Sequence, residues 1–146
     1  MLDQIYNARI LELAGNIPRV GRLARPDATA TAHSKLCGST VTVDIALSDG
    51  RVTDYAHELR ACALGQAAAS ILARHVIGTP VGELRAARES LRRMLAENAP
   101  PPEGKWADLA VLAPVRDYRA RHAATLLAFD AAVSAVDKIE AAAANP

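Results

Sequence analysis

Two cysteines and one histidine are the side chains of this chain best suited to metal or sulfur chemistry. Cys37 and Cys62 are the two cysteines among 146 residues, and each stands where one sequence pattern gives way to another. The residues before Cys62 alternate and those after it follow a helical period, so we expect Cys62 at a helix N-terminus. Unpaired backbone N–H groups at such a place favour the thiolate form of cysteine. Two thiolates brought together would supply half of a site for a soft metal ion.

A predicted β-hairpin brings the two cysteines together. Residues 40–47 alternate between apolar and mostly polar side chains, which is typical of a strand with one buried face. The apolar positions of this strand are Val41, Val43, Ile45 and Leu47. Asp49 and Gly50 supply the positive-φ positions of a tight turn, after which residues 51–60 return antiparallel. Because Cys37 precedes the first strand and Cys62 follows the second, this pairing places both cysteines at the same end of the sheet.

The other elements complete an α+β fold, in which a three-stranded antiparallel sheet is packed on one face by about five helices. We expect residues 1–146 to form a single domain, since the length is that of one domain. Residues 28–35 are predicted to form an edge strand and residues 2–14 a short helix. A later helix is expected to open at Thr79-Pro80, with Thr79 as its N-cap and its arginines facing water. The last helix is predicted from about residue 115 to residues 141–144.

This last helix offers a candidate third ligand. Apolar residues recur along it at steps of three and four, and His122 lies on the stripe. The stripe comprises Tyr118, His122, Leu126, Phe129, Val133 and Val136. His122 is the histidine with the most strongly buried pattern around it, so it is either a metal ligand or an ordinary core residue. His33 is a reserve ligand, whereas His57 and His75 are expected at the surface or at the rim of the site.

Composition disfavours several classes of function. The formal net charge is +1, and one Phe, one Trp and three Tyr are too few for base stacking, so no nucleic-acid partner is expected. No apolar run approaches the roughly 20 residues of a membrane span, and the N-terminus lacks the layout of a signal peptide. We therefore expect a cytoplasmic protein without a membrane partner. In a reducing compartment, two cysteines are expected as ligands, nucleophiles or core residues rather than as a disulfide.

Several short stretches resemble a known family over nearly the whole chain, namely the U-type iron–sulfur cluster assembly scaffolds (IscU, SufU and the N-terminal domain of NifU). Ile5-Tyr6 is similar to the family's opening Tyr helix, and Asn16-Ile17-Pro18-Arg19-Val20-Gly21 is similar to its Asn-Pro-Arg-x-x-Gly loop. Cys37-Gly38-Ser39 is similar to its Cys-Gly-Asp, and Cys62 with Ala68-Ala69-Ser70 is similar to its second cysteine and the helix that follows. The segment around its third cysteine resembles Val115-Arg116 and Thr125-Leu126-Leu127-Ala128-Phe129.

Two departures from the family pattern concern the site. Ser39 stands where the family has an aspartate, so a carboxylate ligand is lost. The third cysteine is absent, and a gapless register places Ala124 at its position, two residues after His122. Given this resemblance, we favour His122 as the ligand that takes the place of the missing third cysteine. The family's chaperone-recognition motif, Leu-Pro-Pro-Val-Lys, has only a partial counterpart in residues 112–116, which leaves the identity of the partner open.

The resemblance implies a scaffold or carrier that is not an enzyme. It would bind iron, a [2Fe–2S] cluster or zinc through Cys37, Cys62 and His122, with Cys62 as an acceptor of persulfide sulfur. Its implied partners are a cysteine desulfurase and recipient apo-proteins, and it would be a monomer or a weak homo-oligomer. Two alternatives stay open: a degenerate homologue that binds a protein partner without metal, and a pure sulfur acceptor. A Cys-His hydrolase is disfavoured, because neither a glycine-rich nucleophile turn nor an orienting acid accompanies the cysteines.

Overall fold

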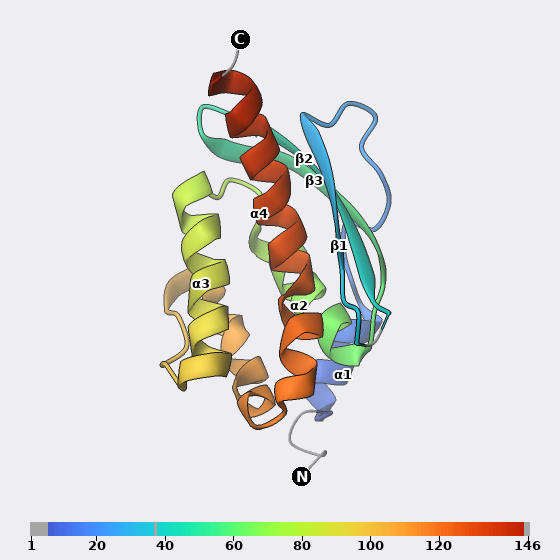
Figure 1. Cartoon of the computed structure of the whole chain (residues 1–146), viewed down its shortest axis with the longest axis vertical. Helices are drawn as coiled ribbons and strands as arrows, with labels where there is room; N and C mark the ends of the chain where they lie inside the picture. Colours follow the sequence, from blue (N-terminus) through green and yellow to red (C-terminus); the bar gives the residue numbers. More distant parts are fainter. Residues whose placement is uncertain (1–5, 37, 145–146) are drawn as a thin grey trace.

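The computed structural model describes residues 6–36 and 38–144. The three strands form one antiparallel sheet in the order β1-β2-β3, with the larger helices gathered on one side of it (Figure 1). The predicted α+β class is therefore confirmed. In chain order the elements are α1 (Ala8–Gly15), β1 (Ala28–His33), β2 (Thr40–Ser48), β3 (Arg51–Arg60), α2 (Ala63–His75), α3 (Val81–Glu97), the 3-10 segments η2 (Gly104–Asp117) and η3 (Arg119–Arg121), and α4 (His122–Ala144).

The β2–β3 hairpin forms as its sequence predicts. Thr40 of β2 pairs with Arg60 of β3, and the turn between the strands has positive φ angles at Asp49 (53°) and Gly50 (74°). Val41, Val43 and Ile45 are fully buried on the inner face of the sheet. Leu47 is only half-buried, because the register shifts between Ala46 and Leu47. Such a bulge bends the strand and redirects the side chains that follow it.

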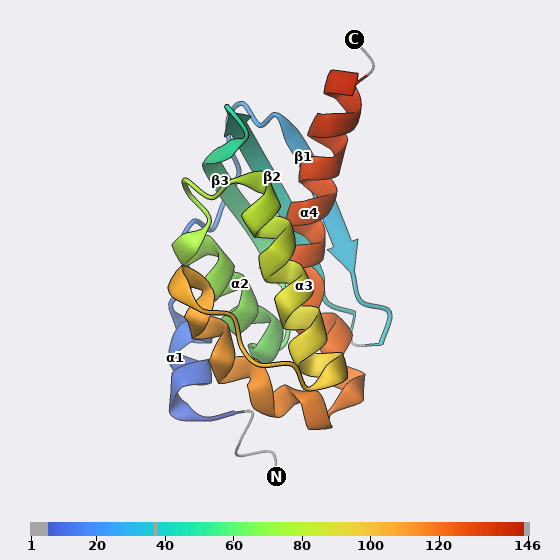
Figure 2. The ribbon, with the colours of Figure 1, turned by 90° about the vertical axis from the view of Figure 1, so that its left-hand side faces the viewer.

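Helices α2 and α4 cover the inner face of the sheet, and α3 lies over α4 on the side away from the sheet (Figure 2). Helix α4 packs against the edge strand β1, and both elements are rich in alanine. Ala28, Ala30 and Ala32 lie at alternate positions of β1, and Ala131, Ala132 and Ala135 of α4 are buried. Short side chains of this kind allow a helix and a strand to approach closely. None of the helices in the described part of the chain is long and apolar enough to cross a membrane.

The segment between α1 and β1 runs along the outer side of the sheet (Figure 1). It is held there by Asp44, whose carboxylate is buried on the outer face and accepts hydrogen bonds from Arg22 Nε (2.8 Å), the Leu23 backbone N–H (2.9 Å) and Thr29 Oγ1 (2.5 Å). These hydrogen bonds, that of Arg22 foremost, lower the pKa of the Asp44 carboxyl to about 2. A carboxylate that remains ionised within the protein stabilises this segment.

Three predicted helix boundaries are wrong. The last helix begins at His122 rather than near residue 115, because residues 104–121 form 3-10 turns that include Pro114, which has no N–H to donate within a helix. The first helix begins at Ala8, capped by the side chain of Asn7, while residues 2–5 of the predicted helix lie outside the described residues. The N-cap of α3 is Pro80, since the Thr79 hydroxyl donates instead to the carbonyl oxygen of His75 (2.9 Å).

The sequence predicts that the arginines of α3 face water, whereas two of them also form ion pairs with α4. Arg88 Nε lies 2.7 Å from Asp130 Oδ1 on α4. Arg85 Nη1 lies 2.6 Å from Asp137 Oδ1, and the same guanidinium also pairs with Glu140. The acidic partners are more than 40 residues away along the chain, which is why helix periodicity alone did not indicate these pairs. They tie α3 to α4 along the outer surface of the helical layer.

Candidate site at the sheet end

Cys62 lies at the junction between β3 and α2, as predicted. It is the N-cap residue of α2, with extended backbone angles (φ −66°, ψ 169°), and its carbonyl oxygen accepts a hydrogen bond from the Gln66 N–H at 2.9 Å. Its side chain is half-buried against the core and, within the described residues, makes no capping hydrogen bond to the helix. A thiol in this place is accessible from outside while the backbone around it is fixed. These are the conditions for a sulfur ligand or a sulfur acceptor.

Residues 34–39 connect β1 to β2 at the same end of the sheet. The Ser34 N–H donates to the Ser39 carbonyl oxygen, and the Gly38 N–H donates to the Ser34 carbonyl oxygen, both at 2.9 Å. Gly38 has a φ of +69°, a backbone conformation that favours glycine. Cys37 itself lies outside the described residues. Because Thr40 pairs with Arg60, the segment that carries Cys37 and the start of α2 lie at one end of the sheet.

Gly65 marks a close approach between α2 and the first turn of α4. A Cβ atom added at Gly65 would lie 3.0 Å from the Ala61 Cβ and 3.1 Å from the Ala124 carbonyl oxygen. Gly65 and Ala124 are both buried. The start of α4 therefore lies against the helix that Cys62 begins. Ala124 is also the position to which the sequence register assigns the family's third cysteine. Sequence reasoning missed Gly65, although a glycine within a helical pattern is a signal of close packing.

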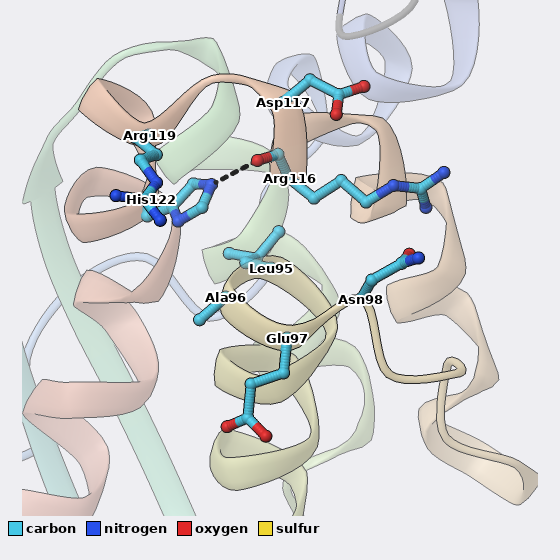
Figure 3. Close-up of a pocket in the computed structure, with 8 residues that line it drawn as sticks. All are labelled: Leu95, Ala96, Glu97, Asn98, Arg116, Asp117, Arg119 and His122. Atoms are coloured by element: carbon cyan, nitrogen blue, oxygen red, sulfur yellow. Dashed lines mark hydrogen bonds between the residues drawn. The ribbon is translucent and has the colours of Figure 1, made fainter.

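His122 is the first residue of α4 and is half-buried rather than embedded in the core. Its Nε2 atom lies 3.1 Å from the carbonyl oxygens of both Val115 and Arg116, at the end of η2 (Figure 3). A carbonyl oxygen only accepts hydrogen bonds, so Nε2 carries the proton and the lone pair of the neutral ring lies on Nδ1. The expected apolar stripe does not continue back to Tyr118, because Tyr118 precedes the helix.

A cavity of about 630 Å³ adjoins His122 on the side of α3. In Figure 3 the side chains of Arg116 and Arg119 extend toward opposite sides of this cavity, and Glu97 lies on its lower wall. Glu97 also pairs with Arg92 at 2.9 Å. Because the two guanidinium groups do not converge, the cavity has no focus of positive charge for an anion. The full lining is Leu95, Ala96, Glu97, Asn98, Arg116, Asp117, Arg119 and His122.

The other histidines differ in their surroundings. His57 is fully buried, so its predicted place at the surface or rim is wrong. It pairs with Val43 on the inner face of the sheet, and its Nε2 lies 2.8 Å from the Pro18 carbonyl oxygen. His75 is partly buried and its Nε2 lies 2.9 Å from Asp108 Oδ2. His33, the reserve ligand, is exposed at the end of β1, beside the 34–39 connection.

Within residues 6–36 and 38–144, no group of three or more His, Cys, Asp or Glu side chains is arranged to hold a metal ion. Cys37 is outside these ranges, so this finding does not include the predicted ligand set of Cys37, Cys62 and His122. That set stays a prediction. The structure shows that Cys62 lies at the sheet end predicted for it, and that Gly65 of the helix it begins lies against the first turn of α4.

Comparison with known proteins gives consistent matches. The model of the NifU-like N terminal domain family matches residues 5–125. The iron-sulfur cluster assembly scaffold protein IscU of Thermotoga maritima is 30% identical over 142 residues, which cover 95% of this chain and 97% of that protein. The crystal structure of a NifU-like protein (N-terminal) from Brucella abortus is 61% identical, with a TM-score of 0.94 over 96% of this chain and 97% of that one.

A more distant structure shares the same fold. It is that of a putative iron-sulfur cluster assembly scaffold protein for the SUF system from Fervidobacterium islandicum, which is 19% identical. Its TM-score is 0.84, over 92% of this chain and 98% of that one. At this level of identity the likeness concerns the fold alone.

Proposed function

This chain belongs to the NifU-like N-terminal domain family, and on that premise we propose that it is a scaffold or carrier in iron–sulfur cluster assembly. The observation that carries the proposal is the family match over residues 5–125, which includes the Cys62 junction. The cargo would be iron, a [2Fe–2S] cluster or zinc. Residues 1–146 would form one scaffold domain that binds and hands on its cargo and catalyses no reaction of its own.

Cys37 and Cys62 are the proposed thiolate ligands, and His122 is the proposed third ligand. Thiolates suit iron, iron–sulfur clusters and zinc, and mixed sulfur and nitrogen ligand sets occur at sites of these kinds. The hydrogen bonds of His122 support this role, because a ligating histidine commonly donates its other ring N–H to a backbone carbonyl. With Nε2 facing the Val115 and Arg116 carbonyl oxygens, Nδ1 is the ring atom that would bind the metal.

Cys62 would in addition accept sulfur. Its thiolate would attack the terminal sulfur of a persulfide on a cysteine desulfurase, taking up that sulfur atom and releasing the desulfurase thiolate. The half-buried side chain at the start of α2 supports this step, since a sulfur acceptor must be within reach of its donor. The proposed partners are therefore a cysteine desulfurase upstream and recipient apo-proteins downstream.

Sulfur transfer without a metal cargo is the second candidate function. Ser39 and Ala124 favour it, because they stand where the family pattern has an aspartate and a cysteine. In this case Cys62 would carry a persulfide after incubation with a desulfurase and free cysteine, visible by mass spectrometry, in protein that contains no iron or zinc. A degenerate homologue would carry neither metal nor sulfur.

Anaerobic purification followed by iron, zinc and acid-labile sulfide analysis tests the proposal. We expect stoichiometric metal in the wild type and its loss in Cys62→Ala and in the Cys37→Ala, Cys62→Ala double variant. All three proteins should retain the same circular dichroism spectrum, because the core consists of buried apolar side chains of the helices and strands and Cys62 only packs against it. Equal metal content in the wild type and the double variant would disprove metal binding at this site.

A further inference from the structure

We infer that Gly65 is a positioning residue, which lets the segment carrying Cys62 lie directly against the first turn of α4. The inference rests on the proposed function and adds to it a residue that holds the two sides of the site at a fixed separation. Gly65 has no side chain that could bind metal or sulfur, so it would act only through its neighbours.

Two contacts carry the inference. A Cβ atom at position 65 would meet the Ala61 Cβ at 3.0 Å and the Ala124 carbonyl oxygen at 3.1 Å. Ala61 directly precedes Cys62, and Ala124 lies in the first turn of α4, two residues after His122. A methyl group at position 65 would therefore press on the segment of one proposed ligand and on the helix of another. Both distances are tight enough that a neighbour must give by a few tenths of an ångström.

Neither neighbour can give by a simple side-chain rotation. One of the atoms is a backbone oxygen of α4, and the other is a Cβ, whose position follows its own backbone. Ala124 is buried, and α4 continues into the core through Leu127 and Ala128. Close-packed interiors accommodate an added methyl group by moving backbone. The expected result is a displacement of the start of α2, and Cys62 with it, relative to α4.

Metal sites are sensitive to displacements of this size. Ligand distances in such sites hold to within about 0.2 Å, so a shift of a few tenths of an ångström between ligands lowers affinity. Changes in residues that orient ligands typically cost roughly 10- to 100-fold in metal affinity. We therefore expect Gly65→Ala to weaken metal binding by about tenfold or more while the chain stays folded.

Gly82 provides a matched control in another helix. It lies in the first turn of α3, is exposed, and has nothing within 4 Å of the place where a Cβ would be added. Neither Gly65 nor Gly82 has a positive φ, so alanine fits the backbone conformation at both positions. The variants Gly65→Ala and Gly82→Ala therefore add the same methyl group to a helix, and only the first adds it against Ala61 and Ala124.

The test is a competition titration of Zn²⁺ against a chromophoric chelator, on the wild type, Gly65→Ala, Gly82→Ala and Cys62→Ala, at a temperature where circular dichroism shows all four folded. Co²⁺ spectra of the same proteins report the geometry around the thiolates, which a purely structural role of Gly65 would leave unchanged. We expect Gly82→Ala to match the wild type, Gly65→Ala to bind Zn²⁺ about tenfold or more weakly with an altered Co²⁺ spectrum, and Cys62→Ala to lose binding.

The outcomes separate the inference from the proposed function. Loss of Zn²⁺ in Cys62→Ala together with wild-type affinity in Gly65→Ala would overturn the role of Gly65 and leave the metal site standing. Wild-type affinity in Cys62→Ala would overturn the metal site and the inference with it. If Gly65→Ala does not fold, the double variant Ala61→Gly, Gly65→Ala replaces it, because it removes the 3.0 Å contact and keeps the 3.1 Å contact with Ala124. Wild-type affinity in that folded double variant would equally overturn the inference.

Discussion

Arg22 Nε lies 2.8 Å from Asp44 Oδ2 and so joins the segment after α1 to the central strand of the sheet. A second bond, from Arg22 Nη2 to Asp44 Oδ1 at 3.1 Å, makes the pair bidentate. The carboxylate is buried whereas the guanidinium is about half exposed. Bidentate arginine–carboxylate pairs fix orientation as well as adding energy. This pair therefore holds the segment against the outer face of the sheet.

We predict that Asp44→Asn lowers the free energy of unfolding by about 2 kcal/mol, because it removes the charged acceptor of several hydrogen bonds. Urea denaturation at neutral pH measures the change. Asp49→Asn is the matched control, since Asp49 is exposed in the hairpin turn and asparagine tolerates its positive φ. An Asp44→Asn protein as stable as this control would show that the pair contributes no net stability.

The same pair predicts a specific acid sensitivity. The Asp44 carboxyl has a pKa of about 2 in the folded protein against an ordinary value of 3.8, so between these values the unfolded chain binds the extra proton. The stability that Asp44 contributes is present above about pH 4 and is lost as the pH falls toward about 2. The difference in unfolding free energy between the wild type and Asp44→Asn should therefore shrink over this range. A difference that stays constant from pH 5 to pH 2 would contradict the assignment.

His57 predicts a second pH dependence, at higher pH. Burial lowers the pKa of His57 below its ordinary value of 6.5. Its Nδ1 is buried without a hydrogen-bond partner among the described residues, so a proton placed there would be a buried charge without an acceptor. The unfolded chain takes up that proton first, and stability should fall as the pH drops below about 6.5.

His57→Gln should flatten this dependence between pH 6.5 and pH 5, because glutamine does not titrate and its amide still offers a donor toward the Pro18 carbonyl oxygen. His33→Gln, at an exposed position, is the control and should leave the dependence unchanged. Thermal unfolding followed by circular dichroism at several pH values makes the comparison. If both variants keep the wild-type slope, His57 does not cause the loss of stability in this range.

Local signals account for the parts of the fold that the sequence predicted. The alternation at Val41, Val43 and Ile45 and the Asp49-Gly50 turn are properties of neighbouring residues, and they were sufficient to predict the hairpin, although not the register shift after Ala46. The junction at Cys62 follows from the same reasoning, because a strand period there meets a helix period. These features depend on backbone preferences that operate over a few residues.

The features that were predicted wrongly or missed depend on contacts between residues far apart in the sequence. The burial of His57 depends on the face of β3 that turns toward the core, and the pairing of Arg88 depends on an aspartate in α4. The start of α4 at His122 depends on how residues 104–121 pack against α2 and α3. The closeness of Gly65 to Ala124 is likewise a product of tertiary packing, which helix periodicity does not describe.

The role of His122 can be decided with three substitutions at the same position. His122→Ala removes both the ring and the hydrogen bonds from Nε2 to the Val115 and Arg116 carbonyl oxygens. His122→Gln removes the ring but retains an N–H donor at about the same reach. If His122 is a ligand through Nδ1, both variants should bind Zn²⁺ at least about tenfold more weakly, equivalent to about 1.4 kcal/mol. His122→Cys should restore binding, because it supplies a third thiolate.

A purely structural His122 predicts a different pattern. His122→Ala would then lower the free energy of unfolding by about 1–3 kcal/mol through the two unsatisfied carbonyl oxygens, His122→Gln would recover much of that loss, and Zn²⁺ affinity would not change in either. Ala123→Ser, at the exposed neighbouring position, is the control for a change in the first turn of α4. Zn²⁺ competition and urea denaturation on each variant separate the two patterns, because only ligation makes His122→Gln stable and yet deficient in metal. Wild-type Zn²⁺ affinity in His122→Gln would remove His122 from the site and leave Cys37 and Cys62 as its proposed ligands.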